Sequence, residues 1–335
     1  MKNVFSYAFS LTLVVLAGAN SSLNASGVSV LPSRFPSLPE GVTSFGAEVM
    51  GDYLYVYGGH VGEAHAYSAE TTLGDFRRLN LKNAEDWETL SPGSRSQGAR
   101  LLSYQGAIYR VGGLQPRKES DGSVGLYSLR EFARYDVAAG EWSSMPSMPD
   151  GRSSHEATVL GSRVYVGGGW KMEGEAGGKF WYDKMFVFDL ARPDAGWKTV
   201  DQPFQRRAVS SDTAGGKVYF IGGMDTENDT SREVNIFDPD TGMWSEGPMI
   251  PSGPMQGFGS AACALDGKLL VSAYSATVIT PNAAGDGWDT IGKLAQRRFF
   301  HRIVPLPHGE LLAIAGASRR DGHLADLEVI ELGTN

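Results

Sequence analysis

A repeat of about 50 residues runs through most of this chain and limits what it can fold into. Five tryptophans are spaced 44 to 55 residues apart, and the first four follow a β-branched or aromatic run that ends in paired glycines. The tryptophans are Trp87, Trp142, Trp197, Trp244 and Trp288, and the runs are residues 53–59, 108–113, 164–169 and 218–223. Each run predicts a strand that stops at a bend, because glycine tolerates a backbone turn where a side chain would collide with a neighbouring sheet.

A second strand is predicted after the variable loop that follows each glycine pair. These strands alternate apolar and polar residues and end at or near an acidic residue, and they cover residues 75–80, 131–136, 184–189, 233–238 and 326–331. A turn then leads to the tryptophan strand. Since 43 of the 335 residues are glycine, about twice the usual share of roughly 7%, the composition also favours a fold with many tight turns.

The glycine pair, the acidic strand end and the spaced tryptophan resemble the kelch repeat, whose units are four-stranded blades of a β-propeller. Five units are clear, although Ser272-Ala273 replaces the glycine pair in the fifth, and a sixth begins with residues 301–317. The resemblance implies an all-β, six-bladed propeller in one domain over residues 26–335. The sixth unit lacks a tryptophan strand, so we expect residues 28–31 to supply the missing strand and close the last blade. We expect the tryptophans and paired glycines to have structural roles.

The first 19 residues have the pattern of a secretory signal peptide. Lys2 precedes an apolar stretch over residues 4–17, and Ala17-Gly18-Ala19 forms a small-x-small cleavage site. A membrane anchor is the alternative, but the polar residues 20–24 follow too soon for a span of about 20 apolar residues. We therefore expect the mature chain to be exported, either to the periplasm or outside the cell, with no membrane span.

Charge and cysteine content exclude several classes of protein. Thirty basic and 38 acidic side chains give a net charge of −8, which argues against a nucleic-acid partner. The single cysteine, Cys263, excludes an intrachain disulfide framework and a multi-cysteine zinc site. Residues 225–229 lack the spacing of an EF-hand, and His60, His65 and Glu63 lack a matching histidine cluster. Cys263 lies in an apolar run, so the copper centre of sugar-oxidising kelch relatives is not expected. We predict no metal and no cofactor.

Arginines precede the first strand in four of the six units, and the repeat predicts that they share one register. They are Arg95, Arg152, Arg207 and Arg298, with Arg206 and Arg302 adjoining. The kelch resemblance places such arginines around the mouth of the central channel, and we call these six residues the arginine collar. Together with His155 and His301, they would bind a carboxylate, sulfate or phosphate. The alternative is structural, since arginines and histidines between blades also bond to carbonyls and acidic side chains of neighbouring strands.

A second candidate site is the rim formed by the loops that follow the first three glycine pairs. The loop over residues 170–182 carries Trp170, Trp181 and Tyr182, whose rings would stack on a sugar or grip a peptide. Packing of these rings over the blade edge is the alternative. The loops over residues 60–69, which begins with His60, and 115–129 are expected on the same side.

Two functional classes follow from these features. The first is a binding module for a protein or a carbohydrate, with an anionic ligand matching the arginines, and a monomer is expected. The second is a sugar-acting enzyme that resembles the kelch-type sialic acid epimerases, or a mutarotase-like isomerase. We favour binding, because the acid–base pair that stands out is His155 next to Glu156, and adjacent strand residues point to opposite faces. The sequence therefore leans against an enzyme without deciding the matter.

Deletion of residues 27–32 tests the predicted closure of the last blade. Loss of the outer strand would expose a sheet edge and apolar faces, so we expect a large loss of stability together with aggregation. Thermal melting and size-exclusion chromatography measure both effects. A truncated chain that stays monomeric with an unchanged melting temperature would show that these residues do not close the sheet.

Overall fold

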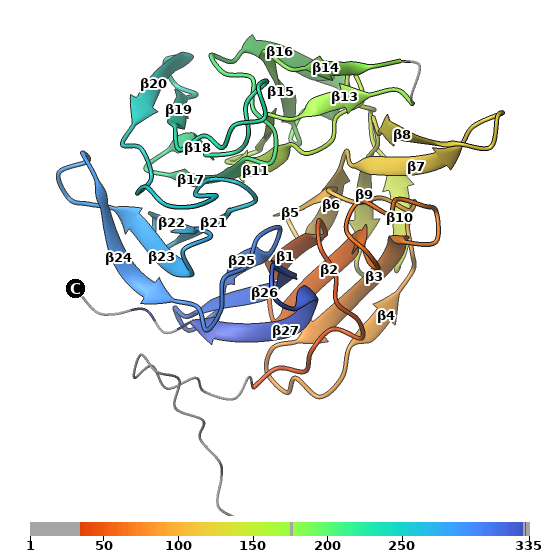
Figure 1. Ribbon diagram of the computed structural model, residues 1–335, viewed down its shortest axis with the longest axis horizontal. Coiled ribbons are helices and arrows are strands. Elements are labelled where there is room, and N and C mark those ends of the chain that lie inside the picture. Colours follow the sequence, from red (N-terminus) through yellow and green to blue (C-terminus); the bar gives the residue numbers. More distant parts are fainter. Residues whose placement is uncertain (1–33, 175–176, 331, 333–335) are drawn as a thin grey trace, which may run out of the picture. The chain divides into compact units, whose positions relative to one another are not determined.

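The computed structural model describes residues 34–174, 177–330 and 332, and these form six antiparallel sheets around a central axis (Figure 1). The prediction of an all-β, six-bladed propeller is confirmed. Helical structure in the described ranges is limited to the 3-10 helix η1 (Pro193–Ala195), so no helix there has the length or apolarity to cross a bilayer.

The first three blades have the same strand order, with the innermost strand first in the sequence. Blade 1 contains β1 (Gly46–Met50), β2 (Tyr53–His60), β3 (Thr72–Asn80) and β4 (Glu88–Leu90). Blade 2 contains β5 (Arg100–Tyr104), β6 (Ala107–Val111), β9 (Phe132–Asp136) and β10 (Glu141–Ser144). Blade 3 contains β11 (Glu156–Leu160), β12 (Arg163–Gly167), β15 (Lys184–Asp189) and β16 (Trp197–Asp201).

The remaining three blades continue this order. Blade 4 contains β17 (Ser210–Ala214), β18 (Lys217–Ile221), β19 (Val234–Asp238) and β20 (Met243–Gly247). Blade 5 contains β21 (Ala261–Leu265), β22 (Lys268–Ser272), β23 (Thr277–Pro281) and β24 (Trp288–Lys293). Blade 6 contains β25 (Arg302–Pro305), β26 (Leu311–Ser318) and β27 (Gly322–Ile330). Within the described residues blade 6 has three strands. The strand predicted over residues 28–31 lies outside them, so the closure of this blade stays a prediction.

Two of the rim loops form hairpins of their own. The loop of blade 2 contains β7 (Leu114–Lys118) and β8 (Val124–Ser128), and that of blade 3 contains β13 (Trp170–Met172) and β14 (Lys179–Trp181). A bridge between Tyr127 and Glu173 joins the two hairpins. The rim loops of blades 2 and 3 therefore contain regular antiparallel strands.

The hydrophobic core consists of six clusters, each shared by two neighbouring blades. The predicted structural role of the tryptophans is confirmed, because each indole Nε1 donates a hydrogen bond to a backbone carbonyl of the chain that precedes its own blade. The acceptors are Pro36 and Ser37 for Trp87, Ser91 for Trp142, Pro146 for Trp197, Asp201 for Trp244 and Pro248 for Trp288. Five of the six seams between described blades therefore combine apolar burial with a directional bond, and the seam between blades 5 and 6 has apolar burial without a tryptophan.

A ring of left-handed residues surrounds one end of the central channel, two positions before the innermost strand of each blade. These ring residues are Ser44, Gly98, Ser154, Ala208, Gly259 and Phe300, with φ between 50° and 68°. Five of their amides donate to the carbonyl of the ring residue in the neighbouring blade, including Ser44 to Phe300 at 3.4 Å and Phe300 to Gly259 at 2.8 Å. The innermost strands then contact one another in sequence around the channel, β25 against β1 included.

The second glycine of each pair packs against the turn that carries a ring residue. A Cβ on Gly169 would lie 2.5 Å from the carbonyl oxygen of Ser153 and 2.8 Å from Cβ of His155. Because Gly169 also has a φ of 81°, both its conformation and its surroundings require the absence of a side chain.

Replacement of Gly169 by alanine tests this packing. Gly161→Ala is the matched control, since Gly161 has a φ of 62° and a Cβ there would meet nothing within 4 Å. We expect Gly161→Ala to cost about 1–2 kcal/mol through left-handed strain alone. Gly169→Ala should cost about 3 kcal/mol or more, because the backbone must also move. Urea denaturation measures both values, and equal losses would contradict the steric explanation.

Candidate functional site

Two cavities occupy the two ends of the central channel. The mouth cavity has a volume of about 560 Å³ and is lined by all six ring residues, at the start of the innermost strands. The far cavity has a volume of about 410 Å³ and is lined by later residues of the same strands, from Glu48 in β1 to Gly161 after β11. Both volumes fall within the range of small-molecule pockets, about 300–1,000 Å³.

One wall of the mouth cavity combines a guanidinium with aromatic rings and thioethers. The Arg207 guanidinium carbon lies 4.4 Å from the ring centroid of Trp170, and its Nη2 lies 2.8 Å from Sδ of Met224. Trp170 also stacks edge-on against Trp181, with centroids 5.3 Å apart, and Lys179 Nζ lies 5.1 Å from the Trp170 ring. This wall therefore offers positive charge on an apolar, aromatic surface.

Arg207 has no acidic partner in the described part of the chain. Its Nε is buried without a hydrogen-bond acceptor there. Its contact with an oxygen acceptor is long, 3.5 Å from Nη2 to Oδ1 of Asn228. Burial lowers the pKa of this guanidinium, and the nearby Tyr67 opposes the shift. An unpaired, half-buried guanidinium in a cavity is a group that an anionic ligand would satisfy.

The channel between the cavities holds an ion triad of Arg100, Glu156 and Arg302. The Arg100 Nε lies 2.7 Å from Glu156 Oε2, and Arg302 Nη1 donates to Glu156 Oε1. Both arginines also donate to backbone carbonyls of a neighbouring blade, Arg302 to Phe45 at 3.0 Å and Arg100 to Ala157 at 3.3 Å. The Glu156 carboxylate is thus held between two cations that are fixed by the sheets.

His155 and His301 both line the mouth cavity. Burial, followed by the charge of Arg152, lowers the pKa of His155 to about 3, and burial also lowers the pKa of His301 well below its usual value. His301 Nε2 lies 2.9 Å from Oγ of Ser272, whereas the His155 ring lies against the backbone of Val111 and Gly112 in blade 2. Both imidazoles are therefore neutral at physiological pH.

The side chains of His155 and Glu156 have different neighbours, in line with the expectation that they point to opposite faces. A Cβ on Gly112 of blade 2 would lie 2.5 Å from Cε1 of the His155 ring, whereas the Glu156 carboxylate contacts Arg100 and Arg302 in the channel.

The register predicted for the arginine collar is correct for Arg152 and Arg298 and wrong for two others. Arg152 and Arg298 each lie two residues before a ring residue. The residues at the equivalent position in blades 2 and 4 are Ser96 and Arg206. Arg95 and Arg207 lie one residue to either side of this position. Isolated backbone bridges confirm this alignment, because in blades 2, 3, 4 and 6 the residue directly before the ring residue forms one. These bridges join Gln97 to Leu114, Ser153 to Trp170, Arg207 to Met224 and Phe299 to Ala317.

The arginines at the shared position lie inside the sheets and do not line the mouth cavity. Arg152, Arg206 and Arg298 are 0%, 2% and 1% exposed. Arg152 donates to the carbonyls of Val166 and Lys184, Arg206 to those of Gly222 and Glu233, and Arg298 to that of Ala315 and to the carboxylates of Asp326 and Glu328. Burial lowers the pKa of Arg152 to about 9 and that of Arg206 to about 10. These three arginines therefore have the structural role given above as the alternative for the arginine collar, since they bond to carbonyls and acidic side chains of the strands.

Some of the other predicted residues lie away from the mouth cavity, and the rest meet in it. Arg95 is exposed and donates to the carbonyls of Ala69 and Thr72, outside the cavity lining. His60 is buried, with its ring 5.4 Å from that of His323, and Tyr182 lies under the Arg152 guanidinium and donates to the carbonyl of Gly151 at 2.7 Å. The structure therefore brings Arg207, Arg302, His155, His301 and Trp170 together in the mouth cavity, with Trp181 against Trp170.

Several lining residues were not singled out from the sequence. Lys179, Met172, Met224 and Phe258 line the mouth cavity, and Glu48, Arg100 and Asp212 line the far cavity. For Glu48, Arg100 and Asp212 the sequence signal is position, because each comes two or four residues after a ring residue. Within the described ranges, no cluster of three or more His, Cys, Asp and Glu side chains is arranged to hold a metal ion.

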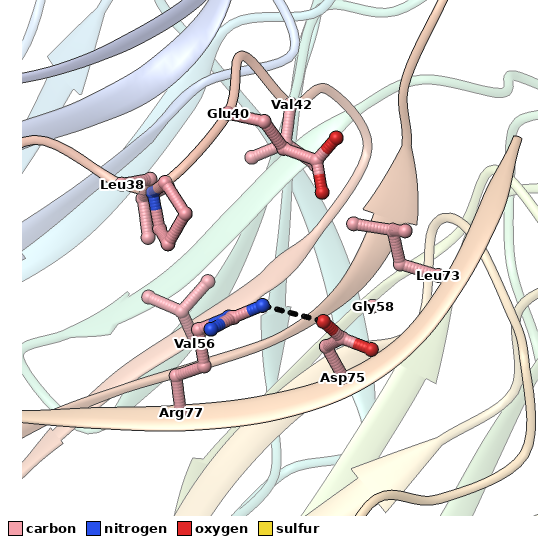
Figure 2. Close-up of a pocket in the computed structure, with 9 residues that line it drawn as sticks. Leu38, Glu40, Val42, Val56, Gly58, Leu73, Asp75 and Arg77 are labelled. Atoms are coloured by element: carbon pink, nitrogen blue, oxygen red, sulfur yellow. Dashed lines mark hydrogen bonds and ion pairs between the residues drawn. The ribbon is translucent and has the colours of Figure 1, made fainter. Parts of the chain in front are cut away.

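A third cavity in blade 1 is too small for a ligand. Its volume is about 30 Å³, comparable to the share of one water molecule in the liquid. Figure 2 shows the Arg77 guanidinium paired with the Asp75 carboxylate beside it, at 2.6 Å, with Leu38, Val56 and Leu73 around them. This pair is a surface contact of the sheet.

The carboxyl of Glu48 should make stability depend on pH. Burial raises its pKa to about 7, while the Arg100 charge and the Ser103 hydroxyl oppose the shift and Asp212 adds to it. The folded state therefore holds this proton more tightly than the unfolded state, whose pKa is near 4.5. As the pH rises from about 4.5 through 7, the folded state loses stability.

Glu48→Gln removes this titration. We expect the free energy of unfolding of the wild type to fall relative to that of Glu48→Gln by on the order of 1 kcal/mol between pH 5 and pH 8. Urea denaturation of both proteins at several pH values measures the difference. A constant difference across this range would show that the folded pKa is not raised.

Comparisons with known proteins agree with the repeat and the fold. The family described as the KLHDC2/KLHL20/DRC7 Kelch-repeats domain matches residues 41–273. Kelch-like protein 35 of Mus musculus is 25% identical over 70% of this chain, and N-acetylneuraminate epimerase of Pasteurella multocida (strain Pm70) is 25% identical over 90% of it. The solved structure of YjhT superimposes with a TM-score of 0.71 at 16% identity, covering 90% of this chain and 100% of that one, and so supports the fold.

The relatives differ in how much of their length this chain covers. It spans 35% of kelch-like protein 35, 63% of the N-(sulfonatooxy)prop-2-enimidothioate sulfolyase of Thlaspi arvense, which is 24% identical over 62% of this chain, and 68% of the epimerase. The matched family model covers more than half of the chain and includes the glycine pairs and tryptophans of the first four units. The chain belongs to the kelch-repeat family.

Proposed function

We propose that this kelch propeller is an exported binding module whose mouth cavity takes a negatively charged group of a protein or a glycan. One observation carries the proposal: the Arg207 guanidinium lines the cavity against Trp170 without a carboxylate partner in the described residues. A ligand carboxylate or sulfate would supply the missing acceptors, and the Trp170 ring would contact the ligand's apolar face.

The charges around the mouth cavity support an anion over a cation. Lys179 adds a second positive charge beside the Trp170 ring. The Glu156 carboxylate on the channel side is already paired with two guanidinium groups. The ligand would therefore meet positive charge at the wall, although the whole chain carries a net charge of −8.

The same geometry argues against acid–base chemistry in this cavity. An efficient general base has a pKa near the working pH, but burial lowers the pKa of His155 to about 3. The Glu156 carboxylate is already paired with Arg100 and Arg302. A sugar-acting enzyme like the epimerase relative remains the alternative, supported by the match over 90% of this chain.

Export rests on the sequence of the first 19 residues. The positive Lys2, the apolar residues 4–17 and the Ala17-Gly18-Ala19 motif are typical of a secretory signal peptide. A secreted or periplasmic location would expose the mouth cavity to acidic peptides and to acidic sugars of the cell surface.

Arg207→Ala tests the binding site. Melting curves with N-acetylneuraminate, galacturonate and a poly-glutamate peptide identify an anion that stabilises the wild type, and calorimetry gives its affinity. We expect Arg207→Ala to weaken binding about tenfold or more, because a charge-assisted hydrogen bond contributes roughly 1.5–3 kcal/mol. The unliganded melting temperature should change little, since Arg207 is only half-buried.

Arg95→Ala is the matched control, because Arg95 is also basic and precedes an innermost strand but lies outside the cavity lining. It should bind the anion as the wild type does. If no anion stabilises the wild type, or if both variants lose binding equally, the mouth cavity is not an anion site. Conversion of N-acetylneuraminate between its α and β anomers by the protein, followed by NMR, would favour the enzyme.

A further inference from the structure

The far cavity is a second, open pocket with its own set of polar groups. Its volume is about 410 Å³, and its polar lining includes Glu48, Arg100, Ser103, Tyr104, Thr158 and Asp212, from four different blades. The ion triad lies between this cavity and the mouth, since Arg302 and Glu156 line the mouth cavity and Arg100 lines the far cavity. The proposed anion site does not use these groups.

Two polar groups of the far cavity keep unused bonding capacity. Oε1 of Glu48 accepts a hydrogen bond from Ser103 at 2.9 Å, while its Oε2 makes none within the described part of the chain. Arg100 uses its Nε for Glu156 and for the carbonyl of Ala157, and its two terminal nitrogens donate to no described residue. A free acceptor and a free donor fork therefore line the same space.

Asp212, in contrast, is satisfied by the protein. Its Oδ1 accepts from Thr158 Oγ1 at 3.1 Å and from the Thr213 amide at 2.7 Å, and its Oδ2 accepts from the Ala264 amide at 2.9 Å. These bonds hold the carboxylate in place and leave it little capacity for metal coordination.

The charges of this cavity oppose each other and so disfavour a charged ligand. A metal cation would lie beside the Arg100 guanidinium, and a small anion would lie beside Glu48 and Asp212. Because burial raises the pKa of Glu48 to about 7, this carboxyl is partly protonated at neutral pH and can also donate. A neutral ligand with many hydroxyl groups matches this mixture, since each hydroxyl both donates and accepts.

We infer that the far cavity binds a neutral polyhydroxylated molecule of monosaccharide size, with neighbouring hydroxyls bonded to the Glu48 carboxyl and the Arg100 guanidinium. Ser103 and Thr158 add hydroxyl groups to the lining, and Tyr104 adds an aromatic side chain. This site is independent of the anion site proposed for the mouth and stands or falls separately from it.

Saturation-transfer NMR and calorimetry with D-glucose, D-galactose, D-mannose and glycerol test the inference on the full-length protein at pH 7. We expect at least one of these compounds to bind the wild type. Glu48→Ala should weaken that binding fivefold or more, whereas Glu48→Gln, whose amide still donates and accepts, should stay within about threefold of the wild type. If Glu48→Ala melts early, Glu48→Met fills the same space without a hydrogen-bonding group and takes its place.

Arg207→Ala separates the two cavities. It removes the proposed anion anchor of the mouth, so sugar binding at the far cavity should be unchanged in this variant. The inference is overturned if no compound binds the wild type, if Glu48→Ala or Glu48→Met binds as the wild type does, or if Arg207→Ala abolishes binding. Stabilisation of the wild type by Ca²⁺ or Mg²⁺ that is lost in Glu48→Gln would identify a cation site and would also overturn it.

Discussion

The hydrogen bonds between left-handed residues around the central channel set the geometry on which the rest of this propeller depends. Ser44, Ser154, Ala208 and Phe300 adopt a backbone conformation that costs about 1–2 kcal/mol for residues with a side chain. The amides of Ser44, Ala208 and Phe300 donate to the carbonyl of the ring residue in the neighbouring blade, and Ser154 accepts from Ala208, which offsets this cost. Because every innermost strand begins two residues later, the ring fixes where each blade starts and which side chains line the channel.

The six core clusters follow from the same arrangement. Each cluster lies between two blades, so a single blade cannot bury its apolar faces alone. The tryptophan indoles add a directional bond at five of the six seams between described blades, for example from Trp197 to the carbonyl of Pro146 at 2.8 Å. Stability is therefore a property of neighbouring pairs, as in other repeat proteins, with the difference that the first and last blades are also neighbours here.

The sequence predicted the fold well because the constraints on the fold repeat. A glycine such as Gly169 has to fit the same close approach in each blade, and Trp142 has to fill the same seam, so both residue types recur at a fixed spacing. The site is different, since each blade contributes a different residue to the channel. Arg207 occupies the position that Ser153 has in blade 3, and Trp170 occupies the position that Met224 has in blade 4, so neither residue type recurs between blades.

The misplaced arginines illustrate the same limit. Alignment on residue type gave Arg95 and Arg207 the position of Arg152, whereas the backbone places Ser96 and Arg206 there. Two neighbouring positions before a strand give an arginine two different environments, as Arg206 and Arg207 show. One points into the sheet, where carbonyls satisfy it, and the other lies in the cavity wall. The sequence alone does not distinguish a shift of one residue in a turn that contains a left-handed position.

The ring has a further consequence for how such a protein diversifies. Its bonds join main-chain atoms, and its members here include serine, alanine, glycine and phenylalanine. Selection on folding therefore constrains the side chains near the channel weakly, and substitutions there can accumulate without loss of the blade arrangement. Relatives about 25% identical to this chain can keep one scaffold while their ligand preferences diverge, because the architecture is inherited through the backbone and the chemistry through a few exchangeable positions.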